Sequence, residues 1–255
     1  MSINMGLDKA SVIVTGGGSG IGRAAALQFA AMGAKVLVAD LNADTANAVV
    51  EEIKASGGEA VVVAGDLSLQ ETVDRVVSTA VDVHGGIDVL INNAGIMDAM
   101  TGPDEVTDAE WERVLGVNLT GPFMLTRAVV PYMLAQGKGA IVNTCSEAGL
   151  RGSAAGTAYT VSKHGIVGLT KSSAIMYRNR GIRVNAVAPG GTATSIVVPS
   201  VEGSLGPAAL GPYFVGVGRI AEADEVAAAI VFLASDAASN ISGAILPTDS
   251  GWSAV

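Results

Sequence analysis

Short apolar runs alternate with longer amphipathic stretches along almost the whole chain. The apolar runs are rich in β-branched residues and stop at small or polar ones, as buried parallel strands do; they cover residues 11–14, 35–39, 60–64, 87–91, 140–144, 182–187 and 244–247. The amphipathic stretches have helical periodicity and cover residues 23–30, 43–56, 70–84, 107–119, 121–136, 158–178 and 223–235. This alternation predicts an α/β fold, a parallel sheet of about seven strands with helices on both faces.

Residues 195–218 interrupt the alternation. This segment is rich in Gly and Pro, lacks periodicity and carries a single charge, at Glu202. Connections of this length in a compact domain are usually functional. We therefore expect a mobile lid over a substrate site. The alternative is a disordered surface loop, which the apolar content of the segment disfavours.

The composition fits one domain that spans residues 1–255. Hydrophobic residues make up 49% of the chain but aromatic residues only 4%, so Ala, Val, Ile and Leu have to fill the core. That mixture is expected of parallel strands covered on both faces. A chain of 255 residues can bury such a core without a second domain.

Charge and apolar patterning exclude several classes of partner. The net charge of −9 argues against nucleic acid and anionic membranes. Every apolar stretch is broken before the roughly 18 residues that a membrane span needs, and residues 1–6 lack a signal-peptide pattern, so a cytoplasmic location is expected. Cys145 is the only cysteine, and neither His84 nor His164 has a second ligand beside it. We expect no disulfide and no metal site.

A glycine-rich turn follows the first apolar run, with the sequence Thr15-Gly-Gly-Gly-Ser-Gly-Ile-Gly22. Glycines at 16, 20 and 22 let the backbone turn sharply, approach a pyrophosphate and open a helix whose N–H groups face the phosphate charge. Glycine-rich turns also occur as plain loops. The second apolar run, however, ends in Asp40, where a dinucleotide fold places an acid on the ribose hydroxyls.

Asp40 also indicates which dinucleotide is bound. Its carboxylate would repel a 2′-phosphate, and Ser19 and Leu41 stand where a phosphate-binding site needs a basic residue. NAD rather than NADP is the expected cofactor.

Small or polar residues follow the other apolar runs as well. In an open parallel sheet, ligands bind outside the carboxyl ends of the strands, where these residues would meet. Taken singly, Asp66 and Asn93 are better explained as turn residues. Their common location favours one site built from Asp66-Leu67, Asn92-Asn-Ala-Gly95, Cys145-Ser146-Glu147 and Pro189-Gly-Gly-Thr-Ala-Thr194.

Tyr159 and Lys163 lie four residues apart on a predicted helix and therefore project from the same face. At about 5 Å and an effective dielectric near 20, the ammonium favours the phenolate by about 3 kcal/mol, or roughly two pKa units. We therefore expect the pKa of Tyr159 to fall from about 10 towards 8, which suits an acid/base near neutral pH. An ordinary helix surface is the alternative.

Together these motifs resemble those of classical short-chain dehydrogenases/reductases over essentially the whole chain. The resemblance implies a Rossmann-type doubly wound fold, a nicotinamide cofactor and a homotetramer. Two positions depart from the family pattern: Thr192 replaces the usual Ile or Val, and Thr248-Asp-Ser-Gly251 replaces a double glycine. The matching residues are Thr15-Gly-x-x-x-Gly20-x-Gly22, Asn92-Asn-Ala-Gly95, Asn118, Ser146, Tyr159-x-x-x-Lys163, and Pro189-Gly190 with Thr194.

The resemblance also implies a role for each residue. Tyr159 is the expected general acid/base, Ser146 orients the substrate oxygen, Lys163 holds the nicotinamide ribose, and Asn118 positions a water that relays protons. Ser146, Glu147 and Tyr159 are expected to contact substrate. Met97 and Leu150 flank the pocket, and Arg151 is expected on its solvated rim. The expected cofactor-binding residues are Gly16, Ser19, Gly20, Ile21, Gly22, Asp40, Asp66, Leu67, Asn93, Ala94, Gly95, Tyr159, Lys163, Pro189, Gly190, Thr192 and Thr194.

The leading hypothesis is an NAD-dependent oxidoreductase that interconverts a hydrophobic secondary alcohol, such as a cyclic one, and its ketone. A 3-oxoacyl carrier-protein reductase is the alternative within the family, although the lid has no basic cluster to dock an acidic carrier protein. A non-catalytic dinucleotide sensor would not need Ser146, Tyr159 and Lys163 together. A methyltransferase would leave Tyr159 and Lys163 without a role. The helices at 121–136 and 158–178 are expected to form the interfaces of the tetramer.

Overall fold

The computed structural model describes residues 5–254 of the chain, and residues 1–4, part of the segment used above to argue against a signal peptide, lie outside that range. Seven parallel strands form one sheet in the order β3-β2-β1-β4-β5-β6-β9. This is the doubly wound Rossmann-type topology, whose order reverses between β1 and β4. The strands are β1 (Ser11–Thr15), β2 (Lys35–Asp40), β3 (Glu59–Ala64), β4 (Val89–Asn92), β5 (Gly139–Thr144), β6 (Ile182–Pro189) and β9 (Ile245–Thr248).

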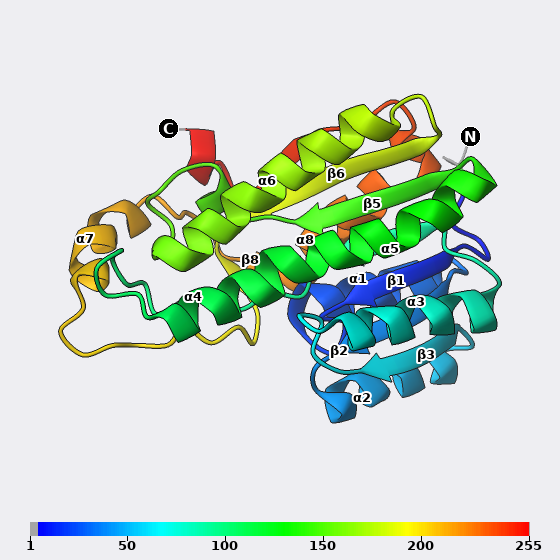
Figure 1. The fold of residues 1–255 in the computed structure, drawn as a ribbon, viewed down its shortest axis with the longest axis horizontal. Helices are drawn as coiled ribbons and strands as arrows, with labels where there is room; N and C mark the ends of the chain where they lie inside the picture. Colours follow the sequence, from blue (N-terminus) through cyan, green and yellow to red (C-terminus); the bar gives the residue numbers. More distant parts are fainter. Residues whose placement is uncertain (1–4, 255) are drawn as a thin grey trace.

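Helices cover both faces of the sheet (Figure 1). On one face pack α1 (Gly20–Ala31), α2 (Ala43–Ala55) and α8 (Ala223–Ala234), whose aliphatic side chains meet those of the strands in one core. On the other face pack α3 (Gln70–His84), α5 (Gly121–Gln136) and α6 (Thr157–Tyr177). Phe29 is the only aromatic side chain among the largest fully buried ones of the described residues, so the core is aliphatic as the composition indicated.

The expected strands and helices all form, with ends that differ by a few residues. The exception is the stretch at 107–119, which was expected as one helix. It begins as α4 (Asp108–Leu115), capped by the Thr107 hydroxyl, and then widens into a π-helical turn, η1 (Gly116–Thr120), that runs into α5. Such π-turns are frequent at functional sites, and this one holds Asn118.

The lid segment was expected to have no regular structure, but it contains a helix, α7 (Leu205–Phe214). Its amino end is tied to a distant loop: the Ser204 hydroxyl and the Leu205 N–H both donate to the carboxylate of Glu105, at 2.9 and 3.0 Å. Two short strands that were not expected, β7 (Thr192–Ala193) and β8 (Ala221–Glu222), pair on either side of the lid. Helix α7 projects beyond the carboxyl ends of the strands (Figure 1).

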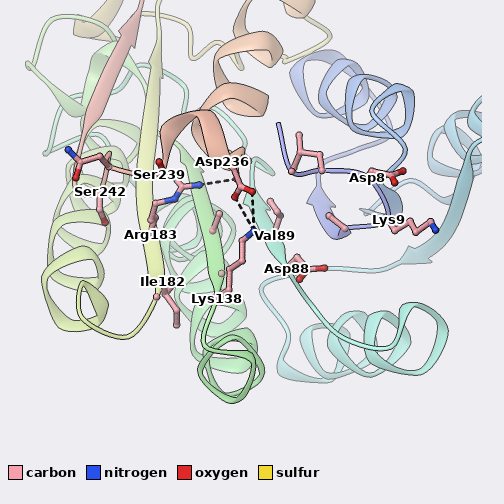
Figure 2. Close-up of a pocket in the computed structure, with 18 of the residues that line it drawn as sticks. Asp8, Lys9, Asp88, Val89, Lys138, Ile182, Arg183, Asp236, Ser239 and Ser242 are labelled. Atoms are coloured by element: carbon pink, nitrogen blue, oxygen red, sulfur yellow. Dashed lines mark hydrogen bonds and ion pairs between the residues drawn. The ribbon is translucent and has the colours of Figure 1, made fainter. Parts of the chain in front are cut away.

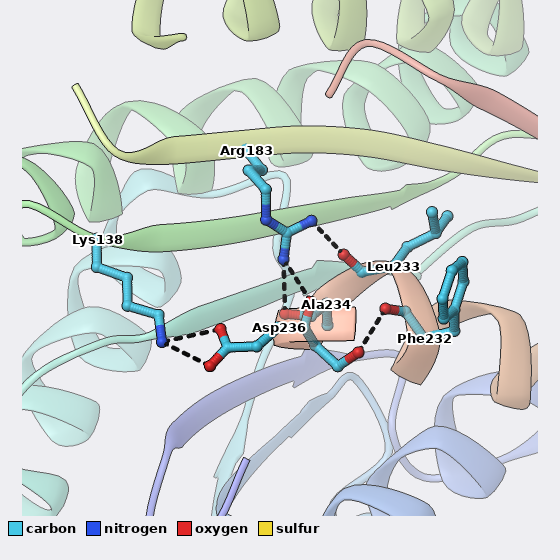
Figure 3. Close-up of polar contacts among 7 residues, drawn as sticks. Lys138, Arg183, Phe232, Leu233, Ala234 and Asp236 are labelled. Carbon is cyan, nitrogen blue, oxygen red and sulfur yellow. Dashed lines mark hydrogen bonds and ion pairs between the residues drawn. The ribbon is translucent and has the colours of Figure 1, made fainter. Parts of the chain in front are cut away.

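A cavity of about 540 Å³ lies at the opposite, amino ends of the strands. Figure 2 shows Lys138 and Arg183 at its wall, with Asp236 between them. The cationic groups of both residues are engaged by the protein itself, as Figure 3 shows. The guanidinium of Arg183 donates to the carbonyls of Leu233 and Ala234 at 2.7 and 3.0 Å, and Lys138 pairs with Asp236 at 3.0 Å.

The Arg183 contacts close the carboxyl end of α8, where exposed carbonyls and the helix dipole favour a cation. The charges at this end of the sheet therefore stabilise the fold. The chemistry has to be sought at the other end.

Candidate active site

A cavity of about 780 Å³ opens at the carboxyl ends of the strands, beside the lid. Nearly all the residues that the sequence assigned to one site lie in its wall. They are Gly16, Ser19, Gly20, Ile21, Asp40, Asp66, Leu67, Asn93, Ala94, Gly95, Ser146, Tyr159, Lys163, Pro189, Gly190, Thr192 and Thr194. The residues expected at this site that are not part of the wall are Gly22, Asn92, Asn118, Glu147, Leu150, Arg151 and Ala193.

The glycine turn forms a cradle that only glycine permits. Gly20 has φ +48°, and a Cβ there would lie 3.1 Å from the side chain of Thr194. A Cβ on Gly22 would collide with the carbonyl oxygen of Gly16, so this glycine lets α1 begin directly against the turn. The Ser19 side chain makes no capping hydrogen bond, and no acidic residue lies in the first turn of α1. Backbone N–H groups at this helix start are therefore available to an anionic group, which fits a dinucleotide pyrophosphate.

Asp40 ends β2 at the cavity wall, and the backbone holds its carboxylate in place. One oxygen accepts a hydrogen bond from Gly18 N–H at 2.9 Å, and the other accepts one from Asn42 N–H at 2.9 Å. A carboxylate can accept about four hydrogen bonds, so acceptor capacity remains for ribose hydroxyls. Leu41 also lines the cavity beside it and brings no cation.

Asn93 ties three strand ends together behind the glycine turn. Its amide donates to the Thr15 carbonyl at 3.0 Å, and its side-chain oxygen accepts from the Thr144 hydroxyl at 3.2 Å. Asp66 uses one carboxylate oxygen for Ser68, accepting from its N–H and its hydroxyl at 2.8 and 2.7 Å. Both residues thus have the turn-forming role considered for them, and both also face the cavity.

Helix α6 carries Tyr159 and Lys163, and a buried acid anchors its start. Asp98, fully buried, accepts hydrogen bonds from Gly156 N–H at 3.2 Å and Tyr159 N–H at 2.9 Å. A carboxylate on the first-turn N–H groups stabilises a helix amino terminus. The loop after β4 thereby sets the position of Tyr159.

Tyr159, Ser146 and Lys163 meet where β5 ends and α6 begins. The Ser146 side chain is hydrogen-bonded to the Tyr159 hydroxyl. The Lys163 ammonium donates to the Thr144 carbonyl at 2.9 Å and lies 5.4 Å from the centroid of the Tyr159 ring. The side chains of Tyr159 and Lys163 are buried, with 8% and 3% of their surface exposed, so little water contacts either polar group.

Burial dominates the protonation of this pair, and the expected lowering of the Tyr159 pKa is wrong in this structure. Loss of solvent raises the pKa of Tyr159 to about 12, although its hydrogen bond with Ser146 acts in the opposite direction. Loss of solvent also lowers the pKa of Lys163 to about 8. The sequence estimate counted the attraction between the two groups but not the cost of burying each charge. The ammonium, moreover, lies near the ring face and is hydrogen-bonded to Thr144.

The buried lysine predicts an unusual dependence of stability on pH. Its pKa is about 8 in the folded protein and 10.5 ordinarily, so between these values the unfolded chain binds more protons and stability rises with pH. Lys163→Met removes this titration, and at pH 7 we expect it to raise the free energy of unfolding by about 1–3 kcal/mol, allowing for the lost hydrogen bond. Urea unfolding of both proteins across pH 7–10 measures the difference. Parallel curves for native protein and variant would contradict it.

Asn118 lies just behind the cavity wall. Its side-chain oxygen accepts from Ile96 N–H at 2.9 Å, and its amide donates to the Ile96 carbonyl at 2.9 Å and to the Ser162 hydroxyl at 3.2 Å. A Cβ on Gly95 would lie 3.5 Å from both Asn118 Oδ1 and Lys163 Nζ. The two side chains therefore approach the same glycine, although the water relay expected between them stays a prediction.

Glu147 was expected to contact substrate and Arg151 to lie on the solvated rim, and neither lines the cavity. Glu147 is 1% exposed and forms an ion pair with Arg151. Arg151 is not a solvated rim residue: its side chain is 27% exposed and its guanidinium lies over the Trp252 ring, 5.1 Å from the centroid. Burial raises the pKa of the Glu147 carboxyl, while the charge of Arg151 acts against this.

An apolar wall completes the cavity on the lid side. Met97, Val197, Phe214 and Trp252 contribute to it, and Arg113 adds a cationic side chain. The sequence predicts Met97 at the pocket and an apolar lid, but it does not predict Arg113 or Trp252 there. Neither belongs to a motif, and Trp252 follows a strand of only four residues near the chain end, so no local pattern marked it.

A comparison with known families decides the identity of this arrangement. The family model described as short chain dehydrogenase matches residues 10–204, which include the glycine turn, Ser146, Tyr159 and Lys163. The chain belongs to the short-chain dehydrogenase family. It is thus an oxidoreductase by family, and its glycine cradle suits the nicotinamide dinucleotides that such enzymes use.

Similar proteins span essentially the whole of this short-chain dehydrogenase. The 3beta-hydroxysteroid dehydrogenase 2 of Eggerthella lenta is 42% identical over 249 residues, 96% of this chain and 95% of the relative. The crystal structure of levodione reductase superimposes with a TM-score of 0.88 at 36% identity, covering 97% of this chain and 99% of the other. A structure assigned as an NAD(P)-dependent gluconate 5-dehydrogenase from Beutenbergia cavernae, with NADP bound at low occupancy, has a TM-score of 0.84 and 37% identity, covering 98% and 99%.

Two further observations concern residues 5–254 of this dehydrogenase. None of the helices in that range is long and apolar enough to cross a membrane. The same range contains no group of three or more His, Cys, Asp or Glu side chains arranged to hold a metal ion.

Proposed function

We propose that this dehydrogenase uses NAD(H) to interconvert a hydrophobic, cyclic secondary alcohol and its ketone, with Tyr159 as the acid/base. The observation that carries the proposal is the convergence of Ser146, Tyr159 and Lys163 on the cavity that also contains the glycine cradle. A dinucleotide sensor would need the cradle alone. Hydride transfer needs a proton donor or acceptor at the substrate oxygen as well.

The glycine cradle and Asp40 would hold the dinucleotide, which would supply the chemistry of hydride transfer. The Tyr159 hydroxyl gives a proton to the ketone oxygen during reduction and removes one from the alcohol during oxidation. Ser146 hydrogen-bonds the same oxygen and fixes its direction. Lys163 is assigned to the nicotinamide ribose, and its positive charge, together with that of an oxidised nicotinamide, opposes the effect of burial on Tyr159. Asn118 is assigned to a water that relays the proton to solvent.

Asp40 supports NAD over NADP, because a 2′-phosphate on the ribose would meet a carboxylate that the backbone holds in place. The bound NADP of the Beutenbergia cavernae protein belongs to a different chain and makes the choice of cofactor worth measuring. The remaining cofactor contacts are assigned to the cavity residues named above.

The lid-side wall supports an apolar ring as substrate. Its aliphatic and aromatic side chains offer few partners to the hydroxyls of a sugar acid, whereas they can bury the carbon skeleton of a cyclic alcohol. The names of the hydroxysteroid dehydrogenase and the levodione reductase agree with that class.

The direct experiment is a panel of secondary alcohols with NAD, followed by the absorbance of NADH. Turnover of cyclic apolar alcohols and not of open-chain hydroxy acids is the expected result. A protein that reduces only 3-oxoacyl carrier-protein thioesters would be a carrier-protein reductase instead. One that binds NADH but turns over none of these compounds would be a sensor.

The lid is expected to close over substrate, and Glu105 to hold its helix in place. Hydrogen bonds from Gly102, Leu205 and Ser204 lower the pKa of Glu105. Its carboxylate therefore stays charged at pH values at which an ordinary carboxyl would begin to take up a proton. Glu105→Ala is expected to speed proteolysis within residues 195–218 several-fold, because α7 loses its amino-terminal attachment. Asp104→Ala, at an exposed neighbour, is the matched control.

The same proteolysis assay tests closure. NADH with a substrate analogue should protect the native segment, since a closed lid buries its cleavage sites. Equal cleavage with and without ligands would count against a lid.

A homotetramer in the cytoplasm completes the proposal. Helices α5 and α6 expose large apolar side chains, among them Phe123 at 47% and Met176 at 72% exposure, which an interface would cover. Light scattering at micromolar concentration should give the mass of four chains. A monomer at that concentration would refute the assembly.

A further inference from the structure

Two aromatic rings meet on the lid side of the cavity, although the chain has only two Trp and four Phe. Phe214 is the last residue of α7, and Trp252 lies in the turn that follows β9. Their ring centroids are 6.2 Å apart with an interplanar angle of 52°, within the range of favourable aromatic pairs. Both rings line the cavity. The lid helix therefore rests on Trp252 at the wall that a substrate would touch.

Arg151 also contacts Trp252. Its guanidinium stacks over the indole and also donates to the Trp252 carbonyl oxygen at 2.6 Å. Gly216 lies close as well, since a Cβ added there would lie 3.4 Å from Cδ1 of the indole. Only 6% of the surface of Trp252 is exposed, and the residue lines the cavity.

Glu147 anchors Arg151, and it directly follows Ser146 in the chain. The carboxylate of Glu147 pairs with Arg151, four residues further along the chain, and faces the carboxyl of Asp249. Asp249 in turn accepts hydrogen bonds from Gly251 N–H at 3.0 Å and Ser253 N–H at 2.8 Å, which fold the turn around Trp252. One connected group of side chains thus joins the residue beside Ser146 to the wall of the cavity.

We propose that Trp252 is a specificity-determining residue of this dehydrogenase, and that Arg151 and Glu147 are its positioning residues. The proposal rests on the function proposed above. Trp252 limits the size of the substrate ring system that fits in the cavity. Through its contact with Phe214, it also holds α7 over the bound substrate ring. Arg151 supplies the stack and the backbone hydrogen bond together, which a lysine cannot do with its single ammonium.

The first test compares a small and a large cyclic substrate, cyclohexanol and a 3β-hydroxysteroid. A Trp side chain covers about 150–250 Å², so Trp252→Ala opens the wall. We expect the ratio of kcat/KM for the steroid to that for cyclohexanol to rise at least about tenfold, through KM rather than kcat, because the proton donor is untouched. Trp252→Phe should keep most of the native ratio. Arg151→Met and Arg151→Lys should both move it in the direction of Trp252→Ala.

The second test does not depend on turnover. Hydrogen exchange of the amides in 205–214 should be several-fold faster in Trp252→Ala and Arg151→Met than in the native protein without substrate. Trp111→Ala, at a partly exposed tryptophan on α4 that does not line the cavity, is the control and should exchange as the native protein does.

The two tests separate the possible failures. A native protein that oxidises no alcohol would refute the proposed function, and unchanged exchange in 205–214 would independently refute the contact between Trp252 and the lid. An unchanged substrate ratio in Trp252→Ala overturns the specificity role even when the exchange rises. If the steroid-to-cyclohexanol ratio shifts in Trp252→Ala but in neither Arg151 variant, Arg151 and Glu147 are not positioning residues of Trp252.

Discussion

Tyr159→Phe is expected to lower kcat by about 10²–10⁴-fold, the usual contribution of a positioned general acid/base. The substitution removes one hydroxyl and keeps the ring, which packs with Ala158 and Val114 in a small buried cluster. The fold and the cradle for the dinucleotide should therefore survive. The measurements are kcat for alcohol oxidation and NADH affinity by fluorescence.

A tyrosine outside the cavity is the control for this substitution. Tyr132 lies on α5, is 39% exposed, and Tyr132→Phe should leave kcat and NADH binding unchanged. Undiminished turnover by Tyr159→Phe would sink the mechanism. Loss of NADH binding along with turnover would assign Tyr159 to the cofactor site instead of to proton transfer.

The native protein is expected to prefer NAD to NADP by several kcal/mol, a factor on the order of 10²–10³ in kcat/KM. The reason is the fixed carboxylate of Asp40, which accepts from the ribose hydroxyls but faces a 2′-phosphate as a like charge. Asp40→Ala should lower efficiency with NAD and narrow the gap between the two cofactors. The ratio of kcat/KM for NAD and NADP in both proteins is the measurement.

Asp82→Ala is a suitable control, because Asp82 is exposed on α3 and lies outside the cavity. A native preference for NADP would remove the argument from Asp40. Equal preference in the native protein and in Asp40→Ala would show that other cavity residues set the selectivity.

Features that arise from local patterns could be predicted from the sequence. The β-branched runs and the glycines that end them determine where strands stop, so the residues after each strand fall at one edge of the sheet. That reasoning placed residues as distant as Gly16 and Thr194 in one cavity, and the structure confirms their proximity. Helical spacing likewise put Tyr159 and Lys163 on one face of α6.

Features that depend on contacts between distant segments could not be predicted from the sequence. Helix α7 contains two prolines and two glycines, which are poor helix formers, and it is held by Glu105 from about a hundred residues away. Arg151 and Trp252 are likewise 101 residues apart and meet only in the folded chain. Burial explains the error at Tyr159, since the exposed fraction of a side chain is a property of the whole fold and decides its pKa here.

The most direct test of the central claim follows the hydride itself. A cyclic secondary alcohol deuterated at its carbinol carbon is incubated with NAD and either native protein or Tyr159→Phe, and the NADH is analysed by mass spectrometry. We expect the native protein to transfer deuterium to NADH. In Tyr159→Phe the rate of this transfer should be lower by about 10²–10⁴-fold. NADH binding without any transfer of deuterium by the native protein would contradict the account.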